Sequence, residues 1–277
     1  MSSAAQAAGF KFVERLAEDL RDERLELPAF PEAVLRIQRA LQSPDTSTDD
    51  VVRILSSEPA LAARLLRIAN SVEFRRMDQE ITDLRRAVSR MGFNMVRSVS
   101  VAFAMRQLRR KDSYSETTRS QLETIWRESL EIAAACFVIA KRRTKVNPEQ
   151  ALLTGLLHVL GRLYIVMRAE DMEELSEADM LEVIGSWDAA VCKAILESWG
   201  LPEAMQTAVE HQNEFDVELE GPATLTDILI AARVLAGGAD HLDCPAMRRL
   251  EIDGAKAETF MEEHADELKS VMASLSE

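Results

Sequence analysis

Apolar residues recur at helical spacing from one end of this 277-residue chain to the other. The longest such segment covers residues 116–141, where apolar or small side chains return every three or four positions, as on one face of a helix. Its predicted buried seam is Leu122, Ile125, Trp126, Ser129, Ile132, Ala133, Cys136, Phe137 and Ala140. No segment alternates apolar and polar residues between tight turns, as an amphipathic strand would. The chain is therefore predicted to be all-α.

Capping residues and prolines mark the predicted helix boundaries. Ser47 is a predicted N-cap followed by two acidic residues, which the positive end of the helix dipole favours. Asn147–Pro148 is a second start signal, and Gly92 is a predicted helix stop. Only 10 Gly and 8 Pro occur in the chain, so turns are sparse and helices numerous. This pattern predicts a compact helical array that begins with an N-terminal helix at residues 1–26.

Several sequence features bear on the cellular compartment. No stretch approaches the roughly 20 uninterrupted apolar residues of a membrane span. The N-terminus has no basic segment followed by a long apolar run, so it makes a poor signal peptide. The cysteines Cys136, Cys192 and Cys244 form no CxxC pair and are expected to be buried reduced thiols. These features predict a cytoplasmic protein that does not enter a membrane.

The formal net charge of −14 is unevenly distributed. Residues 1–150 carry 25 Lys and Arg against 21 Asp and Glu, whereas residues 151–277 carry 8 against 26. The second half should repel nucleic acid and anionic membranes, so nucleic-acid binding is not expected there. The first half presents at most a modest basic surface.

Four blocks of sequence resemble one known domain. Residues 27–71, reading LPAFPEAVLRIQRALQSPDTSTDDVVRILSSEPALAARLLRIANS, resemble the opening of the HDOD domain. The resemblance continues through ITDLRRAVSRMGFNMVRSVSVAFAMR at 81–106 and GLLHVLGRL at 155–163, and it extends over 187–211. The first two blocks are long and distinctive, and they carry most of the resemblance.

The resemblance implies a particular domain organisation. An HDOD domain is expected over residues 27–215, with an N-terminal lobe of HDOD-specific helices at about 27–112. These helices would pack on an HD-like helical bundle at about 113–215. Residues 216–277 are expected to extend the second lobe as further helices.

HDOD domains are related to the HD superfamily of metal-dependent phosphohydrolases. In active members, adjacent His and Asp on one helix bind the metal, together with a His on an earlier helix and an Asp on a later one. Hard divalent cations prefer such carboxylate and imidazole ligands, and the metal activates a water. Here the paired position reads His158–Val159, and valine offers no lone pair. Glu128 stands where many relatives have the earlier His, and Trp187 where they often have another His.

The resemblance therefore implies a degenerate site that holds no metal or other cofactor, in a protein that is not an enzyme. The candidate residues of this vestigial pocket are Glu128, His158, Trp187, Asp188 and His211. A Glu128–His158 hydrogen bond would make it a structural polar pair, because buried polar groups are usually satisfied internally. A small-molecule or partner contact and a metal site are the alternatives.

Two further patterns have functional and structural interpretations. Basic runs at residues 106–111 and 141–145 end predicted helices, where cations suit the helix dipole, so solvated helix ends are favoured over phosphate-binding patches. The helices on either side of Gly92 superficially suggest a helix-turn-helix. The second of them is mostly apolar, whereas base reading needs polar side chains, so core packing is expected.

The resemblance implies a role in bacterial signal transduction. We expect a non-catalytic module, a pseudo-enzyme, that acts by protein–protein interaction with other signalling proteins; homo-oligomers are compatible with this interpretation. One alternative is a residual metal-dependent phosphohydrolase or phosphodiesterase of the HD superfamily. The other is nucleotide or nucleic-acid binding through the basic runs.

Overall fold

All regular secondary structure in the part of the chain that the computed structural model describes is helical. The described residues are 32–41, 43–70, 81–108, 114–170, 177–218, 220–237 and 241–276, with the single positions 14, 17 and 18. No strand occurs among them, and the predicted all-α fold is confirmed. The predicted N-terminal helix at 1–26 lies, apart from the three single positions, outside the described residues.

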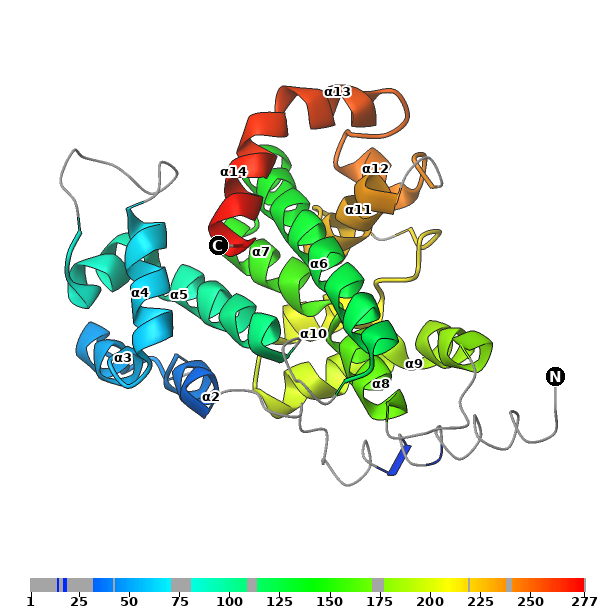
Figure 1. Cartoon of the computed structure of the whole chain (residues 1–277). Coiled ribbons are helices and arrows are strands. Elements are labelled where there is room, and N and C mark those ends of the chain that lie inside the picture. The colour runs from blue at the N-terminus through cyan, green and yellow to red at the C-terminus, as the bar shows by residue number, and fades with distance from the viewer. Residues whose placement is uncertain are drawn as a thin grey trace.

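The helices gather on two sides of the molecule (Figure 1). The first group is α2 (Glu32–Ala40), α3 (Thr48–Leu55), α4 (Pro59–Ala69) and α5 (Leu84–Leu108). The second group is α6 (Glu116–Arg143), α7 (Pro148–Leu157), α8 (Leu160–Ala169), α9 (Glu177–Ser198), α10 (Glu203–Glu210), α11 (Leu225–Gly237), α12 (Pro245–Arg249), α13 (Lys256–Glu263) and α14 (Ala265–Ser276). Helix α5 joins the two groups because it packs against α7.

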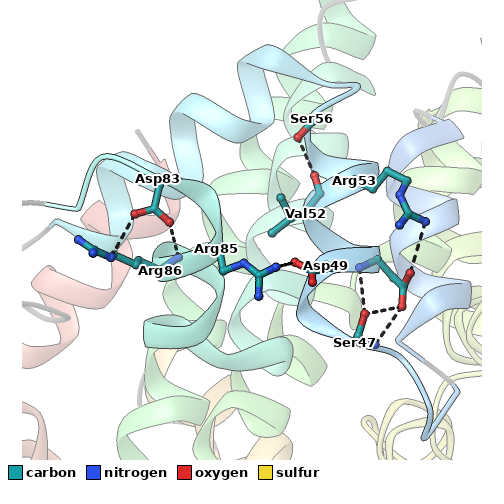
Figure 2. A network of polar contacts seen from close by, with 9 residues as sticks. Ser47, Asp49, Val52, Arg53, Ser56, Asp83, Arg85 and Arg86 are labelled. Carbon is teal, nitrogen blue, oxygen red and sulfur yellow. Dashed lines mark hydrogen bonds and ion pairs between the residues drawn. The ribbon is translucent and has the colours of Figure 1, made fainter.

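Helix α3 begins at the predicted cap. The Ser47 side chain accepts a hydrogen bond from the Asp50 backbone N–H, and the Asp50 carboxylate accepts one from the Ser47 N–H. Figure 2 shows this capping box and the ion pair from Asp49 to Arg85 of α5. Both partners of that ion pair are more than half exposed, so it contributes little to stability. The buried apolar face of α3 therefore holds it against its neighbours.

Gly92 interrupts helix α5, as predicted. Its φ of 76° and ψ of 162° are non-helical, and a φ in this region favours glycine. The helix that follows buries Met95, Val96 and Val99. Because these side chains lie in the core, this segment cannot present them to a DNA groove, and the expected core packing is confirmed.

Helix α6 is the centre of the second group and packs against α7, α8, α11 and α14. Every residue of its predicted seam is buried. Gly155 of α7 lets α7 approach α6 closely, since a Cβ atom there would lie 2.6 Å from the Cα atom of Ala133. The three cysteines are free and buried, as expected.

The apolar run at residues 151–160, after the start signal Asn147–Pro148, has the composition of one buried helix. It is buried, but the helix ends at Leu157 and α8 starts at Leu160. The stretch Pro148–Ala169 has the length and hydropathy of a membrane span, and 89% of its most apolar window is buried inside the fold. This segment therefore forms the core of the bundle.

The basic end of α6 holds the C-terminal helices. Lys141 and Arg142 both donate to the Glu267 carboxylate of α14, at 2.6 Å and 2.7 Å. The Arg143 guanidinium lies over the Phe260 ring of α13, 5.5 Å from its centroid. The predicted helix end is confirmed for this run. Most of the other basic run, residues 109–111, lies outside the described residues.

Helix α14 also contacts the first group of helices. Arg64 of α4, which is only 4% exposed, donates a hydrogen bond to the Leu275 carbonyl near the end of α14. Glu267 attaches the start of α14 to α6, so this helix connects the two groups.

Replacement of Arg64 by Ala is expected to lower the unfolding free energy by about 1–3 kcal/mol, because the buried Leu275 carbonyl loses its donor. Chemical denaturation monitored by circular dichroism measures the change. Arg67 is the control, because it is an exposed residue on the same helix and its Ala variant should stay within about 0.5 kcal/mol of wild type. Equal losses in the two variants would contradict the linking role.

Replacement of Gly161 by Ala is expected to be strongly destabilising, because the new Cβ atom would overlap the Asp188 backbone oxygen. Helices α8 and α9 would have to separate, at a cost of at least about 2–3 kcal/mol. A Cβ atom added to Gly185 of α9 would meet no other atom within 4 Å, so its Ala variant should be neutral or more stable by up to about 1 kcal/mol. Thermal unfolding of the two variants checks the contrast.

Candidate functional site

The predicted pocket residues come from several elements of the second group. Glu128 lies on α6, His158 follows α7, and Asp188 lies on α9. Arg162 of α8 and Arg233 of α11 complete the cluster, because their charges act on both His158 and Asp188. The helix break at His158 positions the site, since it turns the chain between α7 and α8.

His158 is a buried neutral imidazole. The residue is only 1% exposed, and burial lowers its pKa well below the ordinary value, as do the charges of Arg162 and Arg233. The Nδ1 atom lies 2.5 Å from the Gly155 carbonyl oxygen, which can only accept a hydrogen bond. The proton is therefore on Nδ1, and Nε2 keeps its lone pair. Nε2 is buried without a hydrogen-bond partner in the described structure.

Glu128 forms a bidentate ion pair with Arg162. The two guanidinium nitrogens NH1 and NH2 donate to separate carboxylate oxygens, at 3.0 Å and 2.8 Å. The side chains are 20% (Arg162) and 35% (Glu128) exposed, so the pair is only partly open to solvent. The predicted Glu128–His158 hydrogen bond is wrong, because a planar guanidinium matches both carboxylate oxygens at once.

Asp188 and Arg233 are linked through the segment after α10. The Arg233 guanidinium donates to the Gln212 carbonyl and, at 2.7 Å, to the Asn213 side-chain oxygen. The Asn213 amide in turn donates to Asp188 at 3.3 Å. Burial raises the pKa of the Asp188 carboxyl, while Arg162 and Arg233 act in the opposite direction. When Asp188 is ionised, the two negative charges of this cluster equal its two positive charges. The groups concerned are Glu128, Asp188, Arg162 and Arg233.

The remaining predicted residues lie at the edge of this cluster. Trp187 is partly buried against the hydrophobic core. The side chain of His211 is 40% exposed and pairs with Glu214 at 2.9 Å. Its neighbour Gln212 is buried and donates to the His158 carbonyl at 3.3 Å.

A cavity of about 280 Å³ opens beside the cluster. Glu128 and Arg233 line it, together with Glu131 and the stacked rings of Phe215 and His241, whose centroids are 4.5 Å apart. Its wall thus combines charged groups with an aromatic surface, which suits contact with a polar ligand or side chain.

The residues present do not fit a metal of the kind that HD-superfamily phosphohydrolases bind. Val159 is fully buried and has no donor atom, and Arg162 occupies both oxygens of Glu128. Within the described ranges, no three His, Cys, Asp or Glu side chains are grouped so that they could hold a metal ion. Two guanidiniums beside the same groups would also repel a divalent cation.

Sequence reasoning missed Arg162 and Arg233. Arg162 lies four residues after His158 in the stretch GLLHVLGRL, a spacing that brings side chains together on one helical face. Arg233 is the only basic residue of α11, a helix that is otherwise mostly apolar and buried. A basic side chain in such a helix needs a partner, so it is a signal for a buried polar cluster.

The neutral state of His158 predicts a pH-dependent stability. The folded pKa lies well below the 6.5 of an ordinary imidazole, so between those two values only the unfolded chain takes up a proton. Acidification from pH 7 to pH 5 should therefore lower the unfolding free energy by up to about 1.4 kcal/mol per pH unit. Asp188 has the opposite effect on stability, because burial raises its pKa in the folded protein. The folded state therefore takes up this proton at a higher pH than the unfolded chain, and acidification through that range stabilises the fold.

Denaturation midpoints across this pH range measure the effect in wild type and in His158→Asn, which should lack that part of the slope. His211→Asn is the control and should keep the slope, because the buried imidazole remains. If His158→Asn leaves the pH dependence unchanged, the buried imidazole is not its source.

Comparison with known proteins relates this geometry to a family. A family model described as "HDOD domain" matches residues 27–215. An "Uncharacterized protein" of Treponema pallidum (strain Nichols) is 26% identical over 220 residues, which cover 72% of this chain and 40% of that protein. The chain thus spans two fifths of the length of this curated relative.

Solved structures share the fold. A "Putative metal-dependent phosphohydrolase" of Shewanella amazonensis SB2B is 23% identical, with a TM-score of 0.76 over 98% of this chain and 100% of that one. An "HDOD domain protein with unknown function" of Geobacter sulfurreducens is 21% identical, with a TM-score of 0.62 over 95% and 98%. The family match covers well over half of the chain and includes Glu128, His158 and Asp188. The chain belongs to the HDOD domain family.

Proposed function

We propose that this protein is a non-catalytic signal-transduction module that acts by protein–protein contact in the cytoplasm. The Glu128–Arg162 ion pair carries the non-catalytic part of the proposal. A metal-dependent hydrolase needs anionic ligands that are free to hold the cation, and it needs an open position for water. Here a guanidinium engages both oxygens of Glu128, and the buried side chain of Val159 adds no ligand.

Contact with a partner is supported by the surface of the second group of helices. Residues 151–277 carry 26 acidic against 8 basic side chains, a charge that attracts basic partner surfaces and repels nucleic acid. Leu181 and Val217 are large apolar residues with exposed fractions of 62% and 47%. Apolar anchors surrounded by charge are typical of docking surfaces, where the apolar part supplies affinity and the charge supplies specificity.

A residual phosphohydrolase is the second candidate, favoured by one observation. The His158 imidazole keeps a free Nε2 lone pair and a backbone-bound Nδ1–H, which is the tautomer of a metal-binding histidine. The two candidates differ in their requirement for a metal and in turnover.

Purified protein loaded with iron, manganese, magnesium or zinc should bind no stoichiometric metal and hydrolyse no phosphomonoester or phosphodiester. Plasma emission spectroscopy and colorimetric phosphate release measure the two quantities. Stoichiometric iron or manganese, with turnover abolished in His158→Ala, would overturn the non-catalytic proposal. The matched control is His211→Ala, since this histidine is partly exposed and pairs with Glu214.

The contact part of the proposal has its own test. Cross-linking in the native cell identifies candidate partners, and calorimetry with both purified proteins measures binding. We expect saturable binding that persists in EDTA and weakens with salt, since an acidic surface is screened by ions. The proposal fails if none of the candidates binds in purified form.

A further inference from the structure

We propose that Arg162 and Arg233 replace the metal ion of the related hydrolases, as a built-in cation that holds the helices of the second group together. This inference rests on the proposed function in one respect, namely that the site has no catalytic metal. Beyond that function, we assign Arg162 and Arg233 the structural role that a metal ion would have, namely to connect the helices.

The first support is the preserved setting of His158. In metal sites, a ligating histidine donates its other ring N–H to a backbone carbonyl or carboxylate, which fixes the tautomer and aims the lone pair at the metal. His158 has this arrangement, with Nδ1 at 2.5 Å from the Gly155 oxygen. Its Nε2 atom has no partner among the described residues. The imidazole is thus arranged as a ligand in a site whose cation is now a pair of guanidiniums.

The second support is the balance of charge. Arg162 and Arg233 both act to lower the pKa of the buried Asp188 carboxyl, against the effect of its burial. Arg162 neutralises Glu128 by direct contact. Burial and the charge of Arg162 lower the pKa of Arg233, and the charges of Asp188 and Glu128 act to raise it. Together they supply the two positive charges that a divalent metal would bring.

The third support is the set of elements that the arginines connect. A metal ion binds ligands from separate helices and so cross-links them. Arg162 connects α8 to α6 through Glu128. Arg233 connects α11 to the segment after α10, whose Asn213 contacts Asp188 of α9. The two guanidiniums thus connect α8 with α6 directly and α11 with α9 through Asn213, and no chelator removes them.

A variant that lacks one guanidinium should be less stable, and an added divalent cation should restore part of that stability. In Arg162→Ala, Glu128 loses its ion-pair partner, and its carboxylate and the unpartnered Nε2 of His158 are ligand types that bind Mn²⁺. We expect this variant to unfold at a lower temperature than wild type and to regain part of the loss in millimolar MnCl₂. The full chain is measured by circular dichroism, which also reports recovery of helix if the variant is unfolded without metal.

Controls separate this effect from general metal binding. Wild type should show no shift in MnCl₂. Arg142→Ala should show none either, because it breaks an arginine–carboxylate pair with Glu267 elsewhere on α6. Equal MnCl₂ shifts in all three proteins would overturn the proposal, as would the absence of a shift in Arg162→Ala.

A second measurement does not depend on metal. Glu128→Gln should destabilise the protein because it leaves Arg162 without a counter-charge, and Arg162→Gln should do so for the converse reason. The double variant should recover part of the loss, since its two amides are neutral and can bond to each other. Additive losses would contradict a paired role. Phosphoester turnover by wild type would instead overturn the proposed function, so the two failures are distinguishable.

Discussion

The ion pair between Glu128 and Arg162 is the interaction on which the interior of the second group of helices depends. It brings α6 and α8 together at the point where the chain turns between α7 and α8. A buried or half-buried carboxylate is expensive unless it is paired, and a guanidinium pairs with both of its oxygens. The same contact removes Glu128 from any role as a metal ligand. One interaction thus connects two helices of the bundle and occupies both oxygens of Glu128.

Close helix packing surrounds this pair. Gly155 lets α7 approach α6, and Gly161 lets α8 approach α9, in each case at distances that leave no room for a Cβ atom. His158 lies between these two contacts, so its imidazole is excluded from water and stays neutral. The electrostatics of the site therefore follow from the packing. Helix α14 adds a further constraint, because it contacts α6 at one end and Arg64 of α4 near the other.

The sequence predicted much of the fold correctly. Local signals sufficed for the Ser47 cap, the Gly92 break and the α6 seam, because each depends on neighbouring residues in one helix. The resemblance to the HDOD domain agrees with the family match. The site was predicted less well. Glu128 was expected to bond His158, but its partner Arg162 comes from a helix that starts only after the break at His158.

From the sequence alone it was already determined that the chain is all-helical, resembles HDOD domains and has Val159, which carries no donor atom, next to His158. These properties depend on residue identity and local periodicity. Only the tertiary structure decided which carboxylate meets which guanidinium, that Nε2 of His158 has no partner among the described residues, and that His211 pairs with Glu214. The physical reason is that pairing between helices depends on their relative rotation and approach. Those are determined by packing across the whole bundle, including glycines that are distant in sequence from the charges they bring together.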